Sequence, residues 1–288
     1  MVELGGFKLH VLSDGVFHVD GGLIFGIVPR ALWSKRFAPD EENRVPLYLR
    51  PLLVDTGERR VLIDPGIGDT YGEKFRKIYN IEREPGQLLE SLANAGYAPE
   101  DVTDVLFTHL HFDHCGGATK LDDKGVPRLV FPNAYHYASV EEYEQSRNPN
   151  ARTQGSYRAD LIEPVAATGR VHPIRKEADS ILPGFTVLRT PGHTPDHITF
   201  LIQSQGQHLV FWGDLIPLVA HLNPAWAAAL DTHPMDTMES KLKLLRRAVE
   251  EGWHYHYFYH EMKPLLTAEE VAELISVEKE AKPATGAV

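Results

Sequence analysis

The sequence is poor in cysteine and contains no long apolar run. Cys115 is the only cysteine among 288 residues, so no disulfide can form within the chain. A lone cysteine suits a reducing compartment, and we expect a cytoplasmic protein. No stretch of about 18 consecutive apolar residues occurs, which argues against a membrane-spanning helix. The first residues, MVELGGFKLHVL, also lack the basic start and long apolar core of a signal peptide.

Positive charge is scarce as well. The 29 Lys and Arg residues are outnumbered by 40 Asp and Glu residues, which gives a formal net charge of -11. Most of such a surface would repel a polyanion, so we expect a small-molecule substrate and no nucleic-acid partner. Histidine, in contrast, is abundant, with 15 residues, several of them in tight groups.

Strand and helix patterns alternate along the whole chain. Strands are expected at residues 7–12, 16–20, 47–55, 60–64, 102–108, 129–131, 185–190, 198–203, 208–212 and 255–260. Helices are expected at residues 87–95, 238–249 and 267–279, and the tail from residue 281 is expected to be frayed. No repeat or linker interrupts this alternation. We therefore predict a single α/β domain over residues 1–288, with helices covering sheets.

The helix near residues 238–249 has one apolar face at 4-3-4 spacing. That face is formed by Met238, Leu242, Leu245 and Val249. Asp236 and Glu239 have the spacing of a capping box at its start.

The strongest chemical signal is the segment H-x-H-x-D-H at residues 109–114, which directly follows an expected strand. In an extended chain, residues i and i+2 point to one side, so His109 and His111 can aim two imidazoles at one ion. The chain can then turn at Gly116-Gly117 and bring Asp113 and His114 to a second ion. Imidazole nitrogen and carboxylate oxygen suit zinc, and also manganese, iron or cobalt.

One segment cannot complete two metal coordination shells, so further ligands are needed. Three candidates follow expected strands at residues 185–190, 208–212 and 255–260: His193, Asp214 and His260. A lone histidine at a strand end is more often structural than a ligand. Because these three residues occur in series at strand ends, we predict that they complete the site.

These motifs resemble the metallo-β-lactamase superfamily over nearly the whole chain. The matching segments are H-x-H-x-D-H at 109–114, T-P-G-H at 190–193, G-D at 213–214, the late His260, and L-I-D-P-G at 62–66, which is similar to an early D-x-G turn of the family. The resemblance implies an αββα sandwich with two metal ions at one edge, between the sheets. It implies that His109, His111 and His193 bind one ion, that Asp113, His114 and His260 bind the other, and that Asp214 bridges them.

The same resemblance implies that Asp64 and Thr108 orient the ligand histidines, although Asp64 could equally be a plain turn residue. His197 could orient His193 or another ligand, or be a satisfied structural histidine.

Within the superfamily, Asp214 stands where a classical β-lactamase can carry a cysteine ligand. The short stretch after His260 leaves no room for the helical substrate region of hydroxyacylglutathione hydrolases. Residues 21–29, 40–50 and 190–197 are most similar to quorum-quenching N-acyl-homoserine lactonases and to methyl parathion hydrolase. One departure is Pro217, which stands where many lactonases have a carbonyl-binding tyrosine.

We therefore expect a dinuclear metal-dependent hydrolase that opens acyl lactones with a metal-bridging hydroxide. A phosphotriesterase or aryl esterase of the methyl parathion hydrolase type is the alternative. Asp113 is the candidate proton shuttle, and pure metal ligation is its other possible role.

The residues that would contact substrate are less well defined. Phe112, Trp226 and Phe25 could line an apolar mouth, although aromatic residues are more often core. His221 could replace the missing tyrosine as a donor to the substrate carbonyl. The apolar stretch 23–28 could line the mouth or form a homodimer contact.

Overall fold

The structure is a computed structural model that describes residues 1–175 and 180–280. Its strands are β1 (Val2–Leu4), β2 (Phe7–Val11), β3 (Val16–Asp20), β4 (Arg44–Tyr48), β5 (Leu52–Asp55), β6 (Arg60–Ile63), β7 (Asp104–Leu106), β8 (Thr119–Leu121), β9 (Pro127–Leu129), β10 (Tyr135–Ser139), β11 (Val171–Ile174), β12 (Ser180–Leu182), β13 (Phe185–Arg189), β14 (Ile198–Ser204), β15 (Gln207–Phe211), β16 (Tyr255–Tyr257) and β17 (Leu265–Thr267).

The α-helices are α1 (Gly21–Phe25), α2 (Arg30–Trp33), α3 (Glu73–Ile78), α4 (Gln87–Asn94), α5 (Phe112–Cys115), α6 (Val140–Arg147), α7 (Ala159–Ala166), α8 (Pro234–Glu250) and α9 (Ala268–Glu280). Short 3-10 turns are η1 (Pro99–Asp101), η2 (Gly116–Ala118), η3 (Gly213–Leu215) and η4 (Val219–Leu222). The predicted fraying from residue 281 lies outside the described residues.

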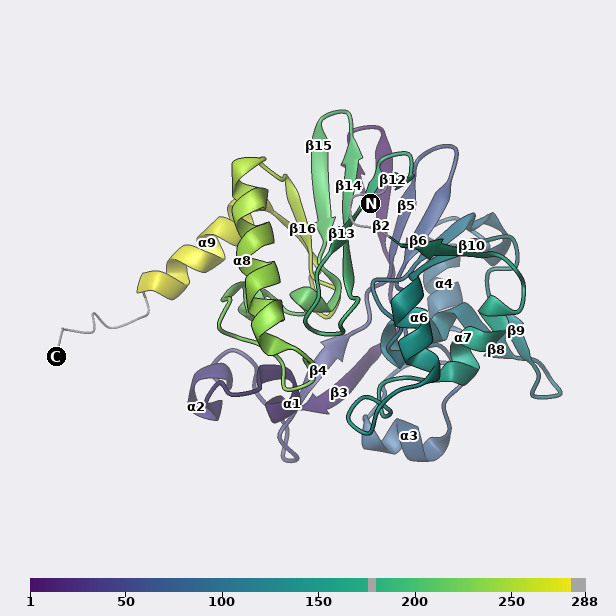
Figure 1. Cartoon of the computed structure of the whole chain (residues 1–288), viewed down its shortest axis with the longest axis horizontal. Coiled ribbons are helices and arrows are strands. Elements are labelled where there is room, and N and C mark those ends of the chain that lie inside the picture. Colours follow the sequence, from purple (N-terminus) through teal and green to yellow (C-terminus); the bar gives the residue numbers. More distant parts are fainter. Residues whose placement is uncertain (176–179, 281–288) are drawn as a thin grey trace.

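Two large sheets pack face to face with helices on their outer sides (Figure 1). One sheet has the strand order β1-β2-β5-β6-β7-β10-β11, and the other has the order β12-β13-β14-β15-β16-β17. The predicted αββα sandwich is therefore confirmed. That residues 1–288 form a single domain stays a prediction.

The central strands of the first sheet are buried on both faces. Nearly every side chain of β5, β6 and β7 is buried, and these strands are continuous apolar runs rather than alternating ones. The inner face packs against the second sheet, and Leu88 and Leu92 of α4 belong to the same core. Such runs are expected where helices cover a sheet whose neighbouring strands, here β6 with β7 and β7 with β10, are parallel.

A separate apolar cluster joins the outer face of the second sheet to its helices. Leu201 of β14 and Val210 of β15 pack with Leu244 of α8 and Val271 of α9. This cluster forms the interface between the second sheet and the helices that cover its outer face. No helix among the described residues is long and apolar enough to cross a bilayer.

Helix α8 forms where the sequence predicts a helix, but it buries a different face. Leu242 and Val249 are 47% and 82% exposed, whereas Leu245 is half-buried against the outer apolar cluster. The fully buried residues of the helix are Thr237, Ser240, Lys241, Leu244 and Ala248. The start of α8 packs closely on the T-P-G-H turn, since a Cβ on Gly192 would lie 2.4 Å from the Thr237 nitrogen. Only glycine at position 192 permits this approach. The predicted capping box is also wrong, because the helix begins at Pro234 and no side chain caps it.

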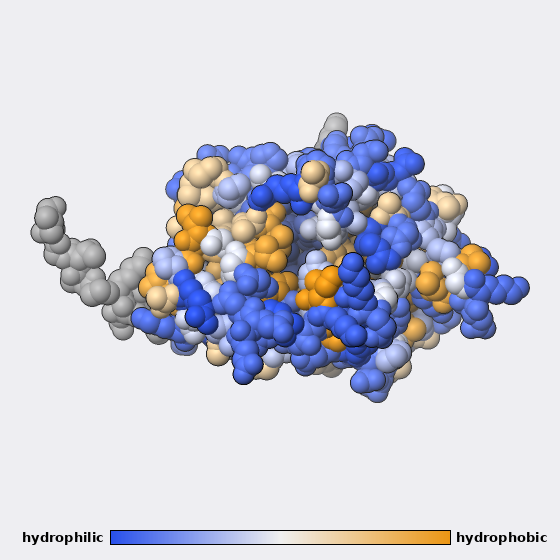
Figure 2. Space-filling model, turned by 90° about the horizontal axis from the view of Figure 1, so that it is seen from below, coloured by the Kyte–Doolittle hydropathy of each residue, from blue (hydrophilic) through white to orange (hydrophobic). Residues whose placement is uncertain are grey.

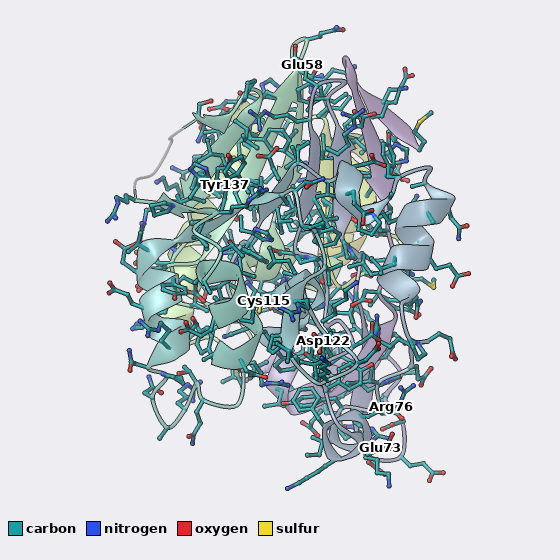
Figure 3. All side chains as sticks on the ribbon, turned by 90° about the vertical axis from the view of Figure 1, so that its right-hand side faces the viewer. Glu58, Glu73, Arg76, Cys115, Asp122 and Tyr137 are labelled. Atoms are coloured by element: carbon teal, nitrogen blue, oxygen red, sulfur yellow. The ribbon has the colours of Figure 1, made fainter. Side chains whose placement is uncertain are left out.

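Two backbone hydrogen bonds join the segments after β7 and β16, which carry predicted site residues, to other strands. The amide of Ile198, in β14, donates to the carbonyl of Thr108, which follows β7, at 3.0 Å. The amide of Tyr48 donates to the carbonyl of His260 at 3.1 Å. In Figure 3, Glu58 at the β5–β6 turn and Glu73 in α3 lie at opposite ends of the molecule, and Cys115, at the end of the histidine-rich segment, lies between them. The loops that carry the predicted site residues are thus fixed to both sheets.

A buried ion pair supports the loop at residues 65–69. The Asp14 carboxylate accepts hydrogen bonds from the amides of Ile67 and Gly68 at 2.8 and 2.9 Å. Arg83, only 4% exposed, donates to Asp14 Oδ1 at 2.5 Å and to the carbonyl of Gly68 at 2.7 Å. The loop abuts the turn after the histidine-rich segment, where the Gly117 amide donates to Gly66. The Asp14–Arg83 ion pair therefore stabilises the loop at residues 65–69, which packs against the histidine-rich segment.

We predict that Arg83→Met lowers the free energy of unfolding by about 3–5 kcal/mol, because it leaves the Asp14 carboxylate buried without its partner. Urea unfolding at fixed metal concentration measures the change. Arg128→Met is the matched control, since Arg128 pairs with Asp122 on the surface and its loss is expected to leave the midpoint nearly unchanged. Equal midpoints for the two variants would contradict a structural role for the buried pair.

Candidate metal centre

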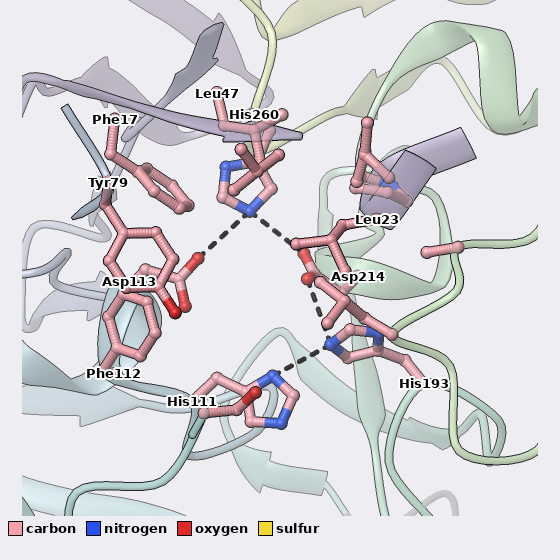
Figure 4. A pocket seen from close by; sticks show the side chains of 16 residues that line it. Phe17, Leu23, Leu47, Tyr79, His111, Phe112, Asp113, His193, Asp214 and His260 are labelled. Atoms are coloured by element: carbon pink, nitrogen blue, oxygen red, sulfur yellow. Dashed lines mark hydrogen bonds and ion pairs between the residues drawn. The ribbon is translucent and has the colours of Figure 1, made fainter. Parts of the chain in front are cut away.

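Loops that follow four strands bring the seven predicted ligands together. The segment after β7 supplies four of them, and the segments after β13, β15 and β16 supply one each: His109, His111, Asp113 and His114, then His193, Asp214 and His260. All seven are buried, with none more than 8% exposed. Figure 4 shows five of them around one hollow.

The donor atoms form three overlapping groups, each with all its atoms within 4.8 Å of one another. The groups are His109, His111 and His193; His109, His114 and Asp214; and Asp113, His114 and His260. The first and third groups match the two ion sites implied by the family resemblance. The second group contains Asp214 and shares a histidine with each of them.

The two oxygens of Asp214 face different histidines. Its Oδ2 atom lies 3.2 Å from His193 Nε2. Its Oδ1 atom lies 3.3 Å from His114 Nε2 and 3.4 Å from His260 Nε2. One carboxylate is therefore positioned between the two halves of the cluster.

Outward hydrogen bonds fix the orientation of three imidazoles. Nδ1 of His114 donates to Asp64 at 2.9 Å, and Nδ1 of His193 donates to Asp231 at 2.9 Å. Nδ1 of His260 donates to the carbonyl of Tyr48 at 3.0 Å. Each ring therefore carries its proton on Nδ1 and turns the Nε2 lone pair toward the cluster. The ring of His111 has the opposite orientation, because its Nδ1 atom and not its Nε2 atom faces another ligand, at 3.0 Å from His193 Nε2.

Unpartnered buried atoms show that the cluster suits cations. Nε2 of His109, Nε2 of His114 and Oδ1 of Asp214 are buried and have no hydrogen-bond partner. Leaving such atoms unpaired costs about 1–3 kcal/mol each. A donor set of imidazole nitrogens and carboxylate oxygens fits divalent zinc, manganese, iron or cobalt.

The electrostatic environment keeps two of the histidines neutral. Burial, followed by the neighbouring imidazoles, lowers the pKa of His109 and of His111 well below the ordinary value. Burial opposes ionisation of Asp214, but the imidazoles of His114, His260 and His193 hold its pKa well below the usual range. For His114 and His193, burial opposes protonation, but the negative charge of Asp214 raises the pKa of each ring. The cluster thus offers the lone pairs of His109 and His111 and the carboxylate charge of Asp214 at neutral pH.

Asp64 and Thr108 lie directly behind the histidine-rich segment. Besides His114, Asp64 accepts from the amide of Thr108 at 2.8 Å and from its hydroxyl at 2.7 Å. The Thr108 oxygen in turn lies 3.0 Å from His109 Nδ1. Asp64 has a positive φ of 46° at the end of β6, a conformation that few non-glycine residues adopt. It contacts a candidate ligand and is more than a turn residue.

His197 orients Asp214 and not His193. Its Nε2 atom accepts a hydrogen bond from the Asp214 amide at 3.0 Å, and its Nδ1 atom lies 2.8 Å from the hydroxyl of Thr190. Burial, helped by the charge of His193, lowers the pKa of His197 to about 3, so the ring stays a neutral acceptor.

Several partners of the cluster carry no recognisable motif. Asp231 holds His193 from a loop 38 residues further along the chain. Glu142, in α6, is 1% exposed; it accepts from the Leu110 amide at 3.1 Å and from the Tyr157 hydroxyl at 2.7 Å. The Tyr259 hydroxyl donates to the Asp113 carbonyl at 2.8 Å. Only the position of Tyr259, next to His260, could have suggested such a role.

An apolar cavity opens beside the cluster. Its walls include Phe17, Leu23, Leu47, Tyr79, Phe112, Pro217 and Leu230, together with His111, Asp113, His193, Asp214 and His260 (Figure 4). Seen from below the view of Figure 1, apolar side chains gather beside a hollow in this face (Figure 2). Phe112 thus lies where the sequence predicts it, and Pro217 offers no donor from the wall.

Three other predicted substrate contacts do not line this cavity. Phe25 is fully buried and stacks on His221, with ring centroids 5.7 Å apart, while Trp226 packs edge-on against Phe25 at 6.0 Å. Nε2 of His221 donates a hydrogen bond to the carbonyl of Ile24, in α1, at 2.8 Å. The expectation that these residues contact substrate is wrong, because they form an aromatic layer behind the cavity wall.

Comparison with known proteins agrees with this geometry. Residues 51–251 match the Metallo-beta-lactamase superfamily. A probable metal-dependent hydrolase from Staphylococcus aureus is 31% identical in sequence, with a TM-score of 0.83 over 90% of this chain and 91% of that chain. The dizinc quorum-quenching lactonase AidC, solved in complex with a product, is 23% identical, with a TM-score of 0.74 over 92% of each chain.

Curated sequence relatives match a smaller region. An N-acyl homoserine lactonase of Bacillus cereus is 29% identical over 162 residues, which is 56% of this chain and 56% of the relative. The chain therefore spans little more than half the length of that relative. The family match over residues 51–251, with the donor cluster on segments that follow strands of both sheets, shows that the chain belongs to the metallo-β-lactamase superfamily.

Proposed function

We propose that this protein is a dinuclear metal-dependent hydrolase that opens acyl lactones. The observation that carries the proposal is the set of three overlapping donor groups at one wall of an apolar cavity. The relatives described as N-acyl homoserine lactonases support the choice of substrate class.

Two divalent ions, zinc foremost, would be held by the seven buried side chains. His109, His111 and His193 would hold one ion, and Asp113, His114 and His260 the other. Asp214 would bridge the pair, because its two oxygens face different histidines at 3.2 and 3.3 Å. When bound, such a pair activates water as a nucleophile at neutral pH and polarises the carbonyl under attack.

Asp113 is the residue proposed to move a proton. Its Oδ2 atom lies 3.5 Å from His260 Nε2 and 3.6 Å from His114 Nε2, and its side chain lines the cavity. In ring opening, the water oxygen bonds to the carbonyl carbon and the ring C–O bond breaks. Asp113 carries the proton released by the water to the departing alkoxide.

The walls would select the acyl part of the substrate. Leu23, Leu47 and Leu230 offer aliphatic surface, and Phe17 and Phe112 offer ring faces. An acyl chain would be removed from water here, at about 0.8 kcal/mol for each buried methylene.

An aryl phosphotriester is the second candidate substrate. Pro217 in the cavity wall favours it, because this position lacks a side-chain donor for a carbonyl oxygen. Aromatic walls also suit an aryl leaving group.

Elemental analysis of the purified protein is expected to find close to two equivalents of zinc, manganese, iron or cobalt. Asp214→Ala should lower the content below that of the wild type, because this carboxylate contacts both halves of the cluster. His208→Ala, in a histidine outside the cluster, serves as the control. Less than one equivalent of metal per chain, after reconstitution with each of the four metals, would contradict the dinuclear proposal.

Asp113→Asn should lower kcat by about 10²–10⁴-fold, the range of a lost general acid–base group, while metal content falls much less. Asp123→Asn, an exposed change of the same kind, is the control. Activity and metal content should be measured on the same samples. If both decline in parallel, Asp113 is only a ligand.

The substrate panel should contain acyl-homoserine lactones, simple γ- and δ-lactones, aryl esters, a phosphotriester and a glutathione thioester. We expect acyl lactones to give the highest kcat/KM. If the phosphotriester leads by more than about tenfold, roughly 1.4 kcal/mol of transition-state preference, the second candidate replaces the first. A lead for the thioester would contradict the choice of lactones as the substrate class.

A further inference from the structure

Tyr79 is a wall residue of the cavity whose position is fixed by its backbone and its ring. Its carbonyl accepts a hydrogen bond from the His18 amide at 2.7 Å, which ties the end of α3 to β3. Its ring centroid lies 4.7 Å from that of Phe75, 5.2 Å from that of Phe112 and 6.2 Å from that of Phe17. The phenol is therefore held in one orientation by packing.

The Tyr79 hydroxyl has no hydrogen-bond partner among the described residues. Two other phenols close to the cluster are engaged, since Tyr157 donates to Glu142 and Tyr259 donates to the Asp113 carbonyl. Figure 4 shows Tyr79 on the same side of the cavity as Asp113. A phenol without a protein partner in an apolar wall is available to a ligand that fills the cavity.

The protonation state of Tyr79 suits a donor. Burial raises the pKa of the phenol above its ordinary value. The hydroxyl therefore keeps its proton at neutral and mildly alkaline pH.

We infer that Tyr79 is a catalytic residue that donates a hydrogen bond to the leaving oxygen of the substrate. The inference rests on the proposed hydrolytic function. Asp113 and Tyr79 lie together, so the oxygen that receives the proton from Asp113 is the one within reach of the phenol. Negative charge develops on this oxygen as the ring C–O bond breaks, and a fixed donor stabilises it. Tyr79 keeps its own proton throughout, and Asp113 supplies the proton that the alkoxide finally gains.

Because the phenol acts on the leaving oxygen, its loss should matter only when the leaving group is poor. Tyr79→Phe is expected to lower kcat on an N-acyl-homoserine lactone by about 10²-fold, as for one lost transition-state donor. On the N-acyl-homocysteine thiolactone with the same acyl chain, the loss should stay below about threefold, since a thiolate leaves readily without a hydrogen bond.

Two variants control for the removed atom and its location. Tyr135→Phe deletes the same hydroxyl from a side chain that is 45% exposed on β10 and should leave both substrates unaffected. Ser156→Ala deletes the other side-chain hydroxyl that lines the cavity. Metal content and urea midpoint of Tyr79→Phe should equal those of the wild type.

Several outcomes would overturn the inference. An equal loss on lactone and thiolactone would place the phenol on the carbonyl oxygen, and a fall in metal content would make it a positioning residue. A selective loss in Ser156→Ala, with none in Tyr79→Phe, would assign the donor to Ser156. If the wild type opens neither ring, the proposed lactonase function has failed. The same wild-type-to-variant ratio is then measured on aryl esters and aryl phosphotriesters of graded leaving-group pKa, where a constant ratio contradicts the inference.

Discussion

The charge balance of the buried donor cluster is the constraint on which the rest of the structure depends. Burial disfavours protonated imidazoles, while the carboxylates of Asp113 and Asp214 need positive charge close by. Divalent cations satisfy both requirements, because they accept lone pairs and carry the missing charge. The lone pairs must then point inward, and the hydrogen bonds that His114, His193 and His260 make on their outer edges provide this orientation.

Those outer partners come from different parts of the sandwich. Asp64 ends a strand of the first sheet, Tyr48 ends β4, and Asp231 lies in the loop before α8. The orientation of the cluster therefore depends on how the two sheets and α8 pack together. Gly192, directly before His193, matters for the same reason, because the absence of a side chain there lets the start of α8 approach the turn.

The candidate ligands could be predicted from the sequence because they occupy local motifs at strand ends. Their partners could not, since Asp231 and Glu142 reach the cluster only through tertiary packing. The face of α8 was predicted only in part, because apolar spacing cannot show that Lys241 is buried through its hydrogen bond to the Trp226 carbonyl. The cavity wall was the least predictable part. Phe25 and Phe112 are both aromatic and near the site, yet only packing decides which of them faces the hollow.

The conformation of Asp64 restricts the evolution of this position. Its left-handed backbone favours glycine, asparagine or aspartate, whereas its bonds to Thr108 and His114 use both side-chain oxygens as acceptors. Glutamate would supply two oxygens with an unsuitable backbone preference, and glycine or asparagine would keep the backbone without the second acceptor. Only one amino acid meets both demands. Each single substitution at this position therefore removes either the backbone preference or an acceptor oxygen behind the histidine-rich segment.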